Sequence, residues 1–236
     1  MQFKRKIVVI TGAANKFGQA LADRFIEEGA RVVISDISED ELKKIALRTG
    51  ATAIVANFRQ KTELKLLVDK AICIFGRIDV FISNAIIEEL EELFLSEGDK
   101  AIRWHLNVMA QMYAAKYVLP QMINRGSGYF VNTIPANGLL DEFHLPFYST
   151  IKHPALSFAE RLAAAHKNAG IKVSVLCVSG IKKPAVPPSI LANRVIDAIR
   201  TGKFIISPGE RTNKFRKKIR RNHCTLENNT DANRKI

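Results

Sequence analysis

The 236-residue sequence is poor in cysteine. It has only Cys73, Cys177 and Cys224, and no two of them stand in a C-x-x-C spacing. A sparse, odd number of distant cysteines argues against a disulfide framework and against a zinc site, so we predict no metal. We expect Cys73 and Cys177 to be small buried hydrophobic residues in a reducing compartment.

The sequence also lacks long apolar runs. The basic start, residues 1–6, leads into only four apolar residues before Thr11, which is too short for the core of a signal peptide. No stretch approaches the length of a transmembrane helix, which is about 20 apolar residues. We therefore predict a cytoplasmic protein without a transmembrane segment.

Acidic residues are outnumbered, with 23 Asp and Glu against 36 Lys and Arg, and the net charge is +13. The densest basic run is residues 211–221, which contain no acid. We expect one domain over residues 1–210 and a basic, flexible C-terminal tail over residues 211–236. Such a tail either contacts anionic surfaces, as in nucleic acid or lipid, or is a solvated terminus without a specific partner.

Hydrophobic residues make up 47% of the chain, enough to bury a sizeable core. Short β-branched runs alternate with amphipathic stretches. The expected strands are residues 6–10, 31–35, 52–56, 78–83, 129–134, 172–178 and 204–207. The expected helices are residues 17–28, 61–75, 99–124, 148–169 and 190–200, and one more that Ser38 opens with Glu41 in a capping box. This alternation predicts an α/β, doubly wound fold: a parallel seven-stranded sheet with helices on both faces.

A glycine-bearing loop lies between the first expected strand and the first expected helix. It reads Thr11-Gly12-Ala13-Ala14-Asn15-Lys16-Phe17-Gly18. Backbone N–H groups at a helix N-terminus bind phosphate, and glycines allow the backbone to approach closely. The loop therefore predicts a site for the pyrophosphate of a dinucleotide.

Asp36 ends the second expected strand, 18 residues past Gly18. A carboxylate there accepts hydrogen bonds from the adenosine ribose hydroxyls and repels a 2′-phosphate, which favours NAD(H) over NADP(H). An ordinary turn aspartate is the alternative. Lys16 keeps NADP(H) open, because a basic residue in this loop can bind a 2′-phosphate.

These motifs resemble the short-chain dehydrogenase/reductase family, whose loop is T-G-x-x-x-G-x-G, and the resemblance covers residues 4–209. It implies a Rossmann fold and a nicotinamide dinucleotide held by Gly12, Asn15, Lys16, Phe17, Gly18 and Asp36. It also implies cofactor contacts from Asn57 and Phe58, after the third strand, and from Asn84 and Ala85, where the family has N-N-A-G. Lys16 and Ile86 stand where the family has glycines, so both crowd the expected cofactor.

Tyr148 and Lys152 form a Y-x-x-x-K pair, which lies on one face of a helix. A lysine ammonium lowers the pKa of a nearby phenol, so the tyrosine can exchange a proton with a carbonyl or alcohol. The resemblance implies that Tyr148 and Lys152 do this work and that Lys152 also binds the nicotinamide ribose. It gives Asn107 the role of shaping a helix and holding a water in the proton relay. The implied reaction is hydride transfer between NAD(P)(H) and a carbonyl or secondary alcohol.

Pro135 stands where the family has its catalytic serine, 13 residues before Tyr148. Proline has neither a hydroxyl nor an N–H to stabilise developing charge, so Thr133 or Ser149 is the candidate substitute. A second hypothesis is therefore a catalytically impaired nucleotide-binding or scaffold protein on the same fold. The resemblance further implies a homodimer or homotetramer formed through the helices over residues 99–124 and 148–169.

Overall fold

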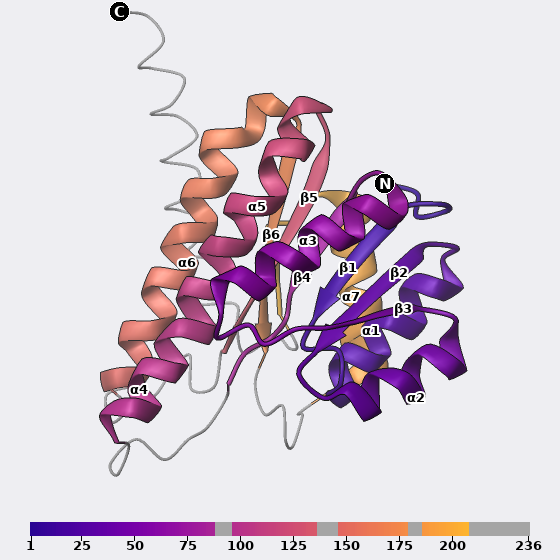
Figure 1. Ribbon diagram of the computed structural model, residues 1–236. Helices are drawn as coiled ribbons and strands as arrows, with labels where there is room; N and C mark the ends of the chain where they lie inside the picture. The colour runs from indigo at the N-terminus through magenta and orange to yellow at the C-terminus, as the bar shows by residue number, and fades with distance from the viewer. Residues whose placement is uncertain (88–95, 136–145, 179–185, 208–236) are drawn as a thin grey trace, which may run out of the picture.

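The computed structural model describes residues 1–87, 96–135, 146–178 and 186–207, with the side chains of 135, 146–150 and 152 left undescribed. A parallel seven-stranded sheet with the order β3-β2-β1-β4-β5-β6-β7 forms its centre (Figure 1). The strands are β1 (Ile7–Thr11), β2 (Arg31–Asp36), β3 (Thr52–Val55), β4 (Val80–Ser83), β5 (Gly128–Pro135), β6 (Ile171–Val178) and β7 (Ile205–Ile206). The predicted fold class is confirmed, and so are the expected strands to within two residues at each end.

Helices cover both faces of the sheet (Figure 1). They are α1 (Lys16–Glu27), α2 (Glu39–Thr49), α3 (Lys61–Phe75), α4 (Glu97–Trp104), α5 (Ala110–Asn124), α6 (Pro146–His166) and α7 (Pro188–Thr201). One core cluster lies under α3, α5 and α6, and the other lies under α1, α2 and α7. In the described part of the chain, no helix is long and apolar enough to cross a membrane.

Strand β1 shows why these runs are continuously apolar. Its side chains alternate between the two faces, so Val8 and Ile10 pack into the α1/α7 cluster and Val9 packs into the α3/α5 cluster. All three side chains are fully buried. A strand buried on both faces has no place for the polar alternation of a half-exposed strand.

The helix predicted over residues 99–124 is wrong in one respect, because a π-helical turn (His105–Met109) separates α4 from α5. The amide of Ala110 donates to the carbonyl of His105, five residues back. Asn107, inside this turn, makes two hydrogen bonds of 2.9 Å with the backbone of Ile87. The sequence pattern gave no sign of this long-range contact.

Ser38 is the N-cap residue as predicted, but the expected capping box and the expected burial of Cys73 are wrong. Ser38 occupies the N-cap position of α2, but its side chain makes no capping hydrogen bond. Its own N–H instead donates to Asp36 Oδ1, at 3.3 Å. Cys73 is exposed rather than buried, because it lies on the solvent side of α3, whereas Cys177 is buried as predicted.

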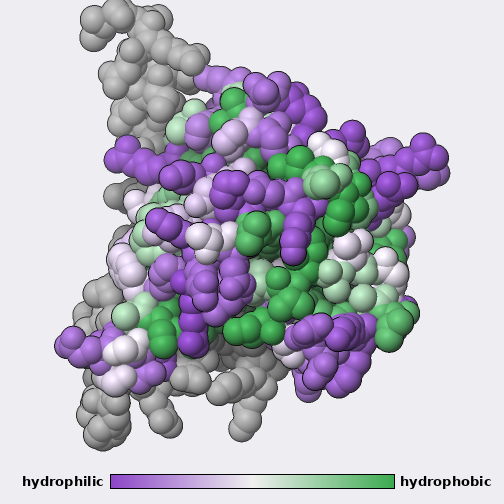
Figure 2. Space-filling view, viewed as in Figure 1, coloured by the Kyte–Doolittle hydropathy of each residue, from purple (hydrophilic) through white to green (hydrophobic). Residues whose placement is uncertain are grey.

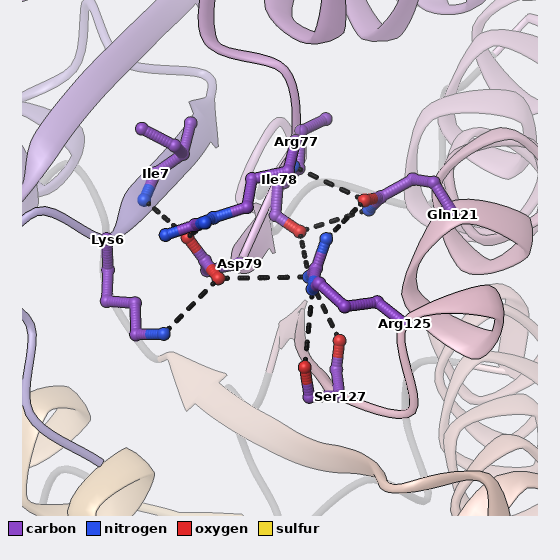
Figure 3. A network of polar contacts seen from close by, with 8 residues as sticks. All are labelled: Lys6, Ile7, Arg77, Ile78, Asp79, Gln121, Arg125 and Ser127. Carbon is purple, nitrogen blue, oxygen red and sulfur yellow. Dashed lines mark hydrogen bonds and ion pairs between the residues drawn. The ribbon is translucent and has the colours of Figure 1, made fainter.

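Asp79 anchors the edge of the sheet at which the strands begin. Its carboxylate is almost fully buried and accepts hydrogen bonds from the Ile7 amide at 2.9 Å and from Arg77 Nε at 3.0 Å. Lys6 Nζ lies 3.5 Å and Arg125 Nη2 lies 3.8 Å from its other oxygen (Figure 3). Burial acts to raise the pKa of Asp79, but the bonds from Ile7 and Arg77 and the charges of Lys6 and Arg77 outweigh it and hold the pKa below its ordinary value.

Candidate dinucleotide site

The turn after β1 is built on two glycines in close contact. Gly12 has φ +65°, and a Cβ there would lie 2.8 Å from Ala85 Cα. A Cβ on Gly18 would meet the carbonyl oxygen of Gly12 and lie 2.6 Å from Ala13 Cα. No larger residue fits at either position unless the backbone moves, so the turn and the start of α1 form one tight unit.

Thr11 and Asn84 fasten this turn to the end of β4. Thr11 Oγ1 accepts hydrogen bonds from the amides of Asn84 at 2.9 Å and Ala85 at 3.1 Å. Asn84 Nδ2 donates to the Gly12 carbonyl at 3.1 Å, and its side chain is almost fully buried. Asn84, predicted to contact the cofactor, therefore holds the glycine turn in place.

Helix α1 begins at the loop with unpaired donors. Asn15 is its N-cap, and Asn15 Oδ1 accepts from the Gly18 amide at 2.8 Å. The amides of Lys16 and Phe17 have no acceptor inside the helix, as is general for a first turn. These amides and the helix dipole favour an anion here.

Lys16 fits the loop without backbone strain. It is the first residue of α1, and its side chain is exposed. Among the described non-glycine residues, only Arg5 has a positive φ. The lysine in place of a family glycine therefore does not distort the turn.

Asp36 faces the same loop from the end of β2. Its Oδ2 accepts from the Ala14 amide at 3.0 Å, and its Oδ1 accepts from the amides of Ile37 at 2.8 Å and Ser38 at 3.3 Å. The carboxylate thus connects the glycine loop to the β2–α2 turn.

These loops enclose a cleft of about 310 Å³, within the range of ligand-binding pockets. It lies where β1 and β4 are neighbours and their connections run to opposite faces, the usual ligand position in such sheets. Six predicted cofactor residues line it: Gly12, Asn15, Asp36, Asn57, Phe58 and Ala85. Its other walls are Ile37, Arg59, Ile86, Ile87 and Leu106. Lys16, Phe17, Gly18 and Asn84 do not line the cleft.

Asn57 and Phe58 shape the far end of the cleft. Asn57 Oδ1 accepts from the Arg59 amide at 3.1 Å, and the Asn57 amide donates to Glu63 at 2.6 Å. The side-chain carbonyl of Asn57 keeps one lone pair for a further hydrogen bond. Phe58 is mostly buried in the core and so contributes a rigid wall.

The structure describes the side chains of only some of the catalytic candidates. Tyr148 and Lys152 both lie in α6, but their side chains fall outside the described residues. Thr133 is completely buried and is not among the residues that line the cleft. Pro135 is the last residue of β5.

Two residues of the site were missed from the sequence. Thr11 belongs to the glycine motif, but nothing in the motif shows that its hydroxyl accepts hydrogen bonds from the amides that follow β4. Arg59 lines the cleft two residues after Asn57, where no pattern marks it. Among the described residues, no three His, Cys, Asp or Glu side chains gather where they could hold a metal ion.

The arrangement is that of a Rossmann-type dinucleotide site: a glycine turn, a free helix N-terminus and a carboxylate at the end of the second strand. The residues fit a dinucleotide, because Gly12, Asn15 and Asp36 line a cleft beside the first-turn amides of α1, which favour an anion.

Comparison with known proteins identifies the family. A model of the short chain dehydrogenase family matches residues 6–190. An uncharacterized oxidoreductase of Thermotoga maritima is 33% identical over 184 residues, which cover 75% of this chain and 72% of that protein. The meso-2,3-butanediol dehydrogenase of Serratia marcescens is 27% identical over 186 residues, covering 77% and 74%. The chain belongs to the short-chain dehydrogenase/reductase family.

The fold agrees with solved structures. A short-chain dehydrogenase/reductase from Burkholderia phymatum, crystallised in complex with NAD, superposes with a TM-score of 0.83. The two chains are 22% identical, and 93% of each is covered.

Proposed function

We propose that this protein is an oxidoreductase that transfers a hydride between NAD(H) and a carbonyl or secondary-alcohol substrate. The observation that carries this proposal is the cleft, in which six predicted residues from separate loops meet beside the first-turn amides of α1. Membership of a dehydrogenase family supports it. The nicotinamide ring would supply the hydride or accept it.

In this proposal Tyr148 is the general acid and base, which gives a proton to the substrate oxygen or takes one from it. Lys152, one helical turn on, favours the phenolate and binds the nicotinamide ribose. Asn107 is a positioning residue: it holds the π-helical turn against Ile87 and supports the proton relay to Lys152.

NAD(H) is the proposed cofactor rather than NADP(H). Asp36 Oδ1 already accepts two N–H groups, whereas Oδ2 accepts one and keeps a lone pair for a ribose hydroxyl. The carboxylate also repels a 2′-phosphate. Lys16 and Arg59, both exposed, are the groups that favour NADP(H).

Calorimetric titration with NADH and, separately, NADPH tests the cofactor site. We expect NADH to bind with a micromolar Kd and more tightly than NADPH. Asp36→Asn should narrow or reverse this preference, since the amide keeps an acceptor but loses the negative charge. Asp40→Asn, an equal charge change in α2 away from the cleft, should leave the ratio unchanged. If neither nucleotide binds, the scaffold hypothesis is the better one.

Restoring the family serine tests whether the rest of the site is competent. Pro135→Ser should raise turnover about a hundredfold, because a lost donor of this kind typically costs that much. Pro135→Ala removes the ring without adding a hydroxyl and is the matched control. NADH oxidation is followed with a panel of ketones and aldehydes. Equal rates for the two variants on every substrate would favour the catalytically impaired alternative.

We also propose a homo-oligomer formed through α5 and α6, in the cytoplasm. Trp104, the last residue of α4, keeps 38% of its surface exposed and precedes α5 in the chain. Ala114 and Ala115 are buried inside the subunit, so they do not support the interface. Analytical ultracentrifugation decides the state. The exposed thiol of Cys73 suits a reducing compartment.

A further inference from the structure

The edge of the sheet opposite the cleft carries a dense row of positive charge. We define the amino edge as the segments that lead into β1, β2, β4, β5, β6 and β7: residues 1–6, 28–31, 76–79, 125–127, 170–172 and 202–204. These segments hold eight Lys or Arg and only two acidic residues. Six of the basic side chains are exposed: Lys4, Arg5, Arg31, Arg77, Lys172 and Lys203.

The two acids of the amino edge are already engaged. Asp79 is almost fully buried and bonded to Ile7 and Arg77. Glu28 forms ion pairs with Arg24 and Arg200. Lys6, Arg77 and Arg125 lie around Asp79. Within the described ranges, no ion pair reaches the five remaining cations, Lys4, Arg5, Arg31, Lys172 and Lys203. Their charge is therefore open to solvent.

The strand order turns these scattered sequence positions into a row. The six strands are consecutive neighbours from β2 to β7, and Ile7 pairs with Arg31 in register. Strands lie about 4.8 Å apart, so the row spans about 24 Å. This strand spacing is shorter than the Debye length of about 8 Å in physiological salt, so the fields of cations on neighbouring strands add. In Figure 2 the upper margin, where the strands begin, is largely hydrophilic.

The backbone conformation of Arg5 is a second, independent feature of the amino edge. Its φ is +61°, in the left-handed region that a non-glycine residue rarely adopts. The amide of Arg5 donates to the Gly29 carbonyl at 2.8 Å and so holds this conformation. An exposed arginine is thus kept on the amino edge at a conformational cost.

The positive charge belongs to this edge and not to the opposite one. The described loops at the carboxyl edge, residues 12–16, 36–38, 56–60 and 84–87, carry one acid and two bases. The amino edge is therefore a separate surface, and a ligand there leaves the cleft open.

The side chains of the amino edge suit phosphates better than a membrane. Among its described residues, Met1 is the only exposed large hydrophobic side chain, and no exposed aromatic is available to stack on a base. Stable membrane attachment needs inserted apolar groups as well as basic charge. A guanidinium group can donate two hydrogen bonds to two oxygens of one phosphate. A nucleic-acid duplex presents about fourteen phosphates over 24 Å.

We propose that the amino edge binds the phosphate backbone of nucleic acid without sequence preference. The bound polyanion lies across the starts of β2, β1, β4, β5, β6 and β7 and releases counterions as it binds. Binding is consequently strongly salt-dependent and independent of NADH.

Fluorescence anisotropy with a labelled 20-base-pair DNA duplex of arbitrary sequence tests this proposal on the full chain. The edge variant replaces Lys4, Arg31, Lys172 and Lys203 with Gln. The control variant replaces four exposed cations on or beside the helix faces, Lys61, Lys70, Lys116 and Arg161, with Gln, so both keep the same net charge and the same basic tail. At 50 mM salt the edge variant should bind at least about tenfold more weakly than the control, and its slope of log K against log salt should be shallower by about 2 to 4.

Equal weakening in both variants would show that net charge or the tail is responsible and would overturn the proposal. An unchanged edge variant would do the same. Binding to vesicles that contain phosphatidylserine is measured in the same way. If the edge variant loses affinity for the vesicles but keeps its affinity for DNA, the surface is a membrane site instead. NADH affinity and the thermal midpoint report that each variant is folded, and the pairs Lys4/Arg31 and Lys172/Lys203, changed separately, keep the test valid if the fourfold variant unfolds.

Discussion

Replacing Gly18 with alanine is expected to abolish measurable NADH binding and to destabilise the domain by about 1–3 kcal/mol, the usual cost of forcing an extra group into a packed place. The added Cβ would collide with the Gly12 carbonyl oxygen and with Ala13 Cα, which are both backbone atoms. Either the turn opens or α1 moves away from it. In both cases the first-turn amides of Lys16 and Phe17 leave their positions beside the cleft.

Gly98→Ala is the matched control for this variant. Gly98 also lies in the first turn of a helix, α4, but the nearest atom to a Cβ there is Ser96 Oγ at 3.7 Å. Alanine is the better helix former, so this change should be neutral or slightly stabilising. NADH titration and urea unfolding of both variants make the comparison. A Gly18→Ala protein that binds NADH within threefold of the parent would show that the glycine contact does not position the site.

Asp79→Asn is expected to lower the free energy of unfolding at pH 7 by about 2–3 kcal/mol, because hydrogen bonds to a charged group are lost or weakened in a buried place. The bonds from Ile7 and Arg77 lose their anionic acceptor, and Lys6 and Arg125 lose their nearby counter-charge. The network lies at the amino edge, so the Kd of the folded protein for NADH should not change. Urea unfolding followed by circular dichroism gives the energy.

The effect of Asp79 should depend on pH with a defined sign. Its pKa is held below the ordinary aspartate value, so the folded state binds its proton less readily than the unfolded chain. The stabilisation is therefore complete above the unfolded pKa of about 3.9 and disappears as the pH falls through the lower folded pKa. The gap between the parent and Asp79→Asn should shrink in acid below this range.

Asp69→Asn is the control for this pair of measurements. Asp69 forms an ion pair with Lys65 on the outside of α3, where both side chains are at least half exposed. Such surface pairs contribute about 0–1 kcal/mol, so its removal should have little effect at either pH. If both variants lose the same free energy of unfolding, the buried Asp79 network contributes no more to stability than a surface ion pair.

The sequence was sufficient for features that depend on local pattern. The apolar runs predicted the strands, and the spacing of Gly12, Gly18 and Asp36 predicted three groups that meet at one loop. These features are predictable because β-strand burial and phosphate turns impose the same residue types wherever they occur.

Features that depend on a particular contact or on the orientation of a helix were not predictable. The π-helical turn at Asn107 needs the backbone of Ile87, 20 residues away. Ser38 looked like a capping residue, but Asp36 takes its amide. Cys73 was assigned to the core from residue type, whereas its position on the face of α3 decides its exposure. Asn107 is decided by a contact with another segment, Ser38 by a residue two positions earlier, and Cys73 by the orientation of its helix.

Side-chain hydrogen bonds connect β1 to the β4 segment at both ends of β1. At the beginning of β1, Asp79 accepts from the Ile7 amide, and at its end Thr11 Oγ1 accepts from the Asn84 amide. A slip of one strand by a single residue would break both bonds at once and turn every side chain of that strand to the wrong face. The two hydrogen bonds thus fix the register between segments that lie more than 70 residues apart in sequence. The position of the glycine turn relative to the end of β4 is therefore set by the fold itself, without a ligand.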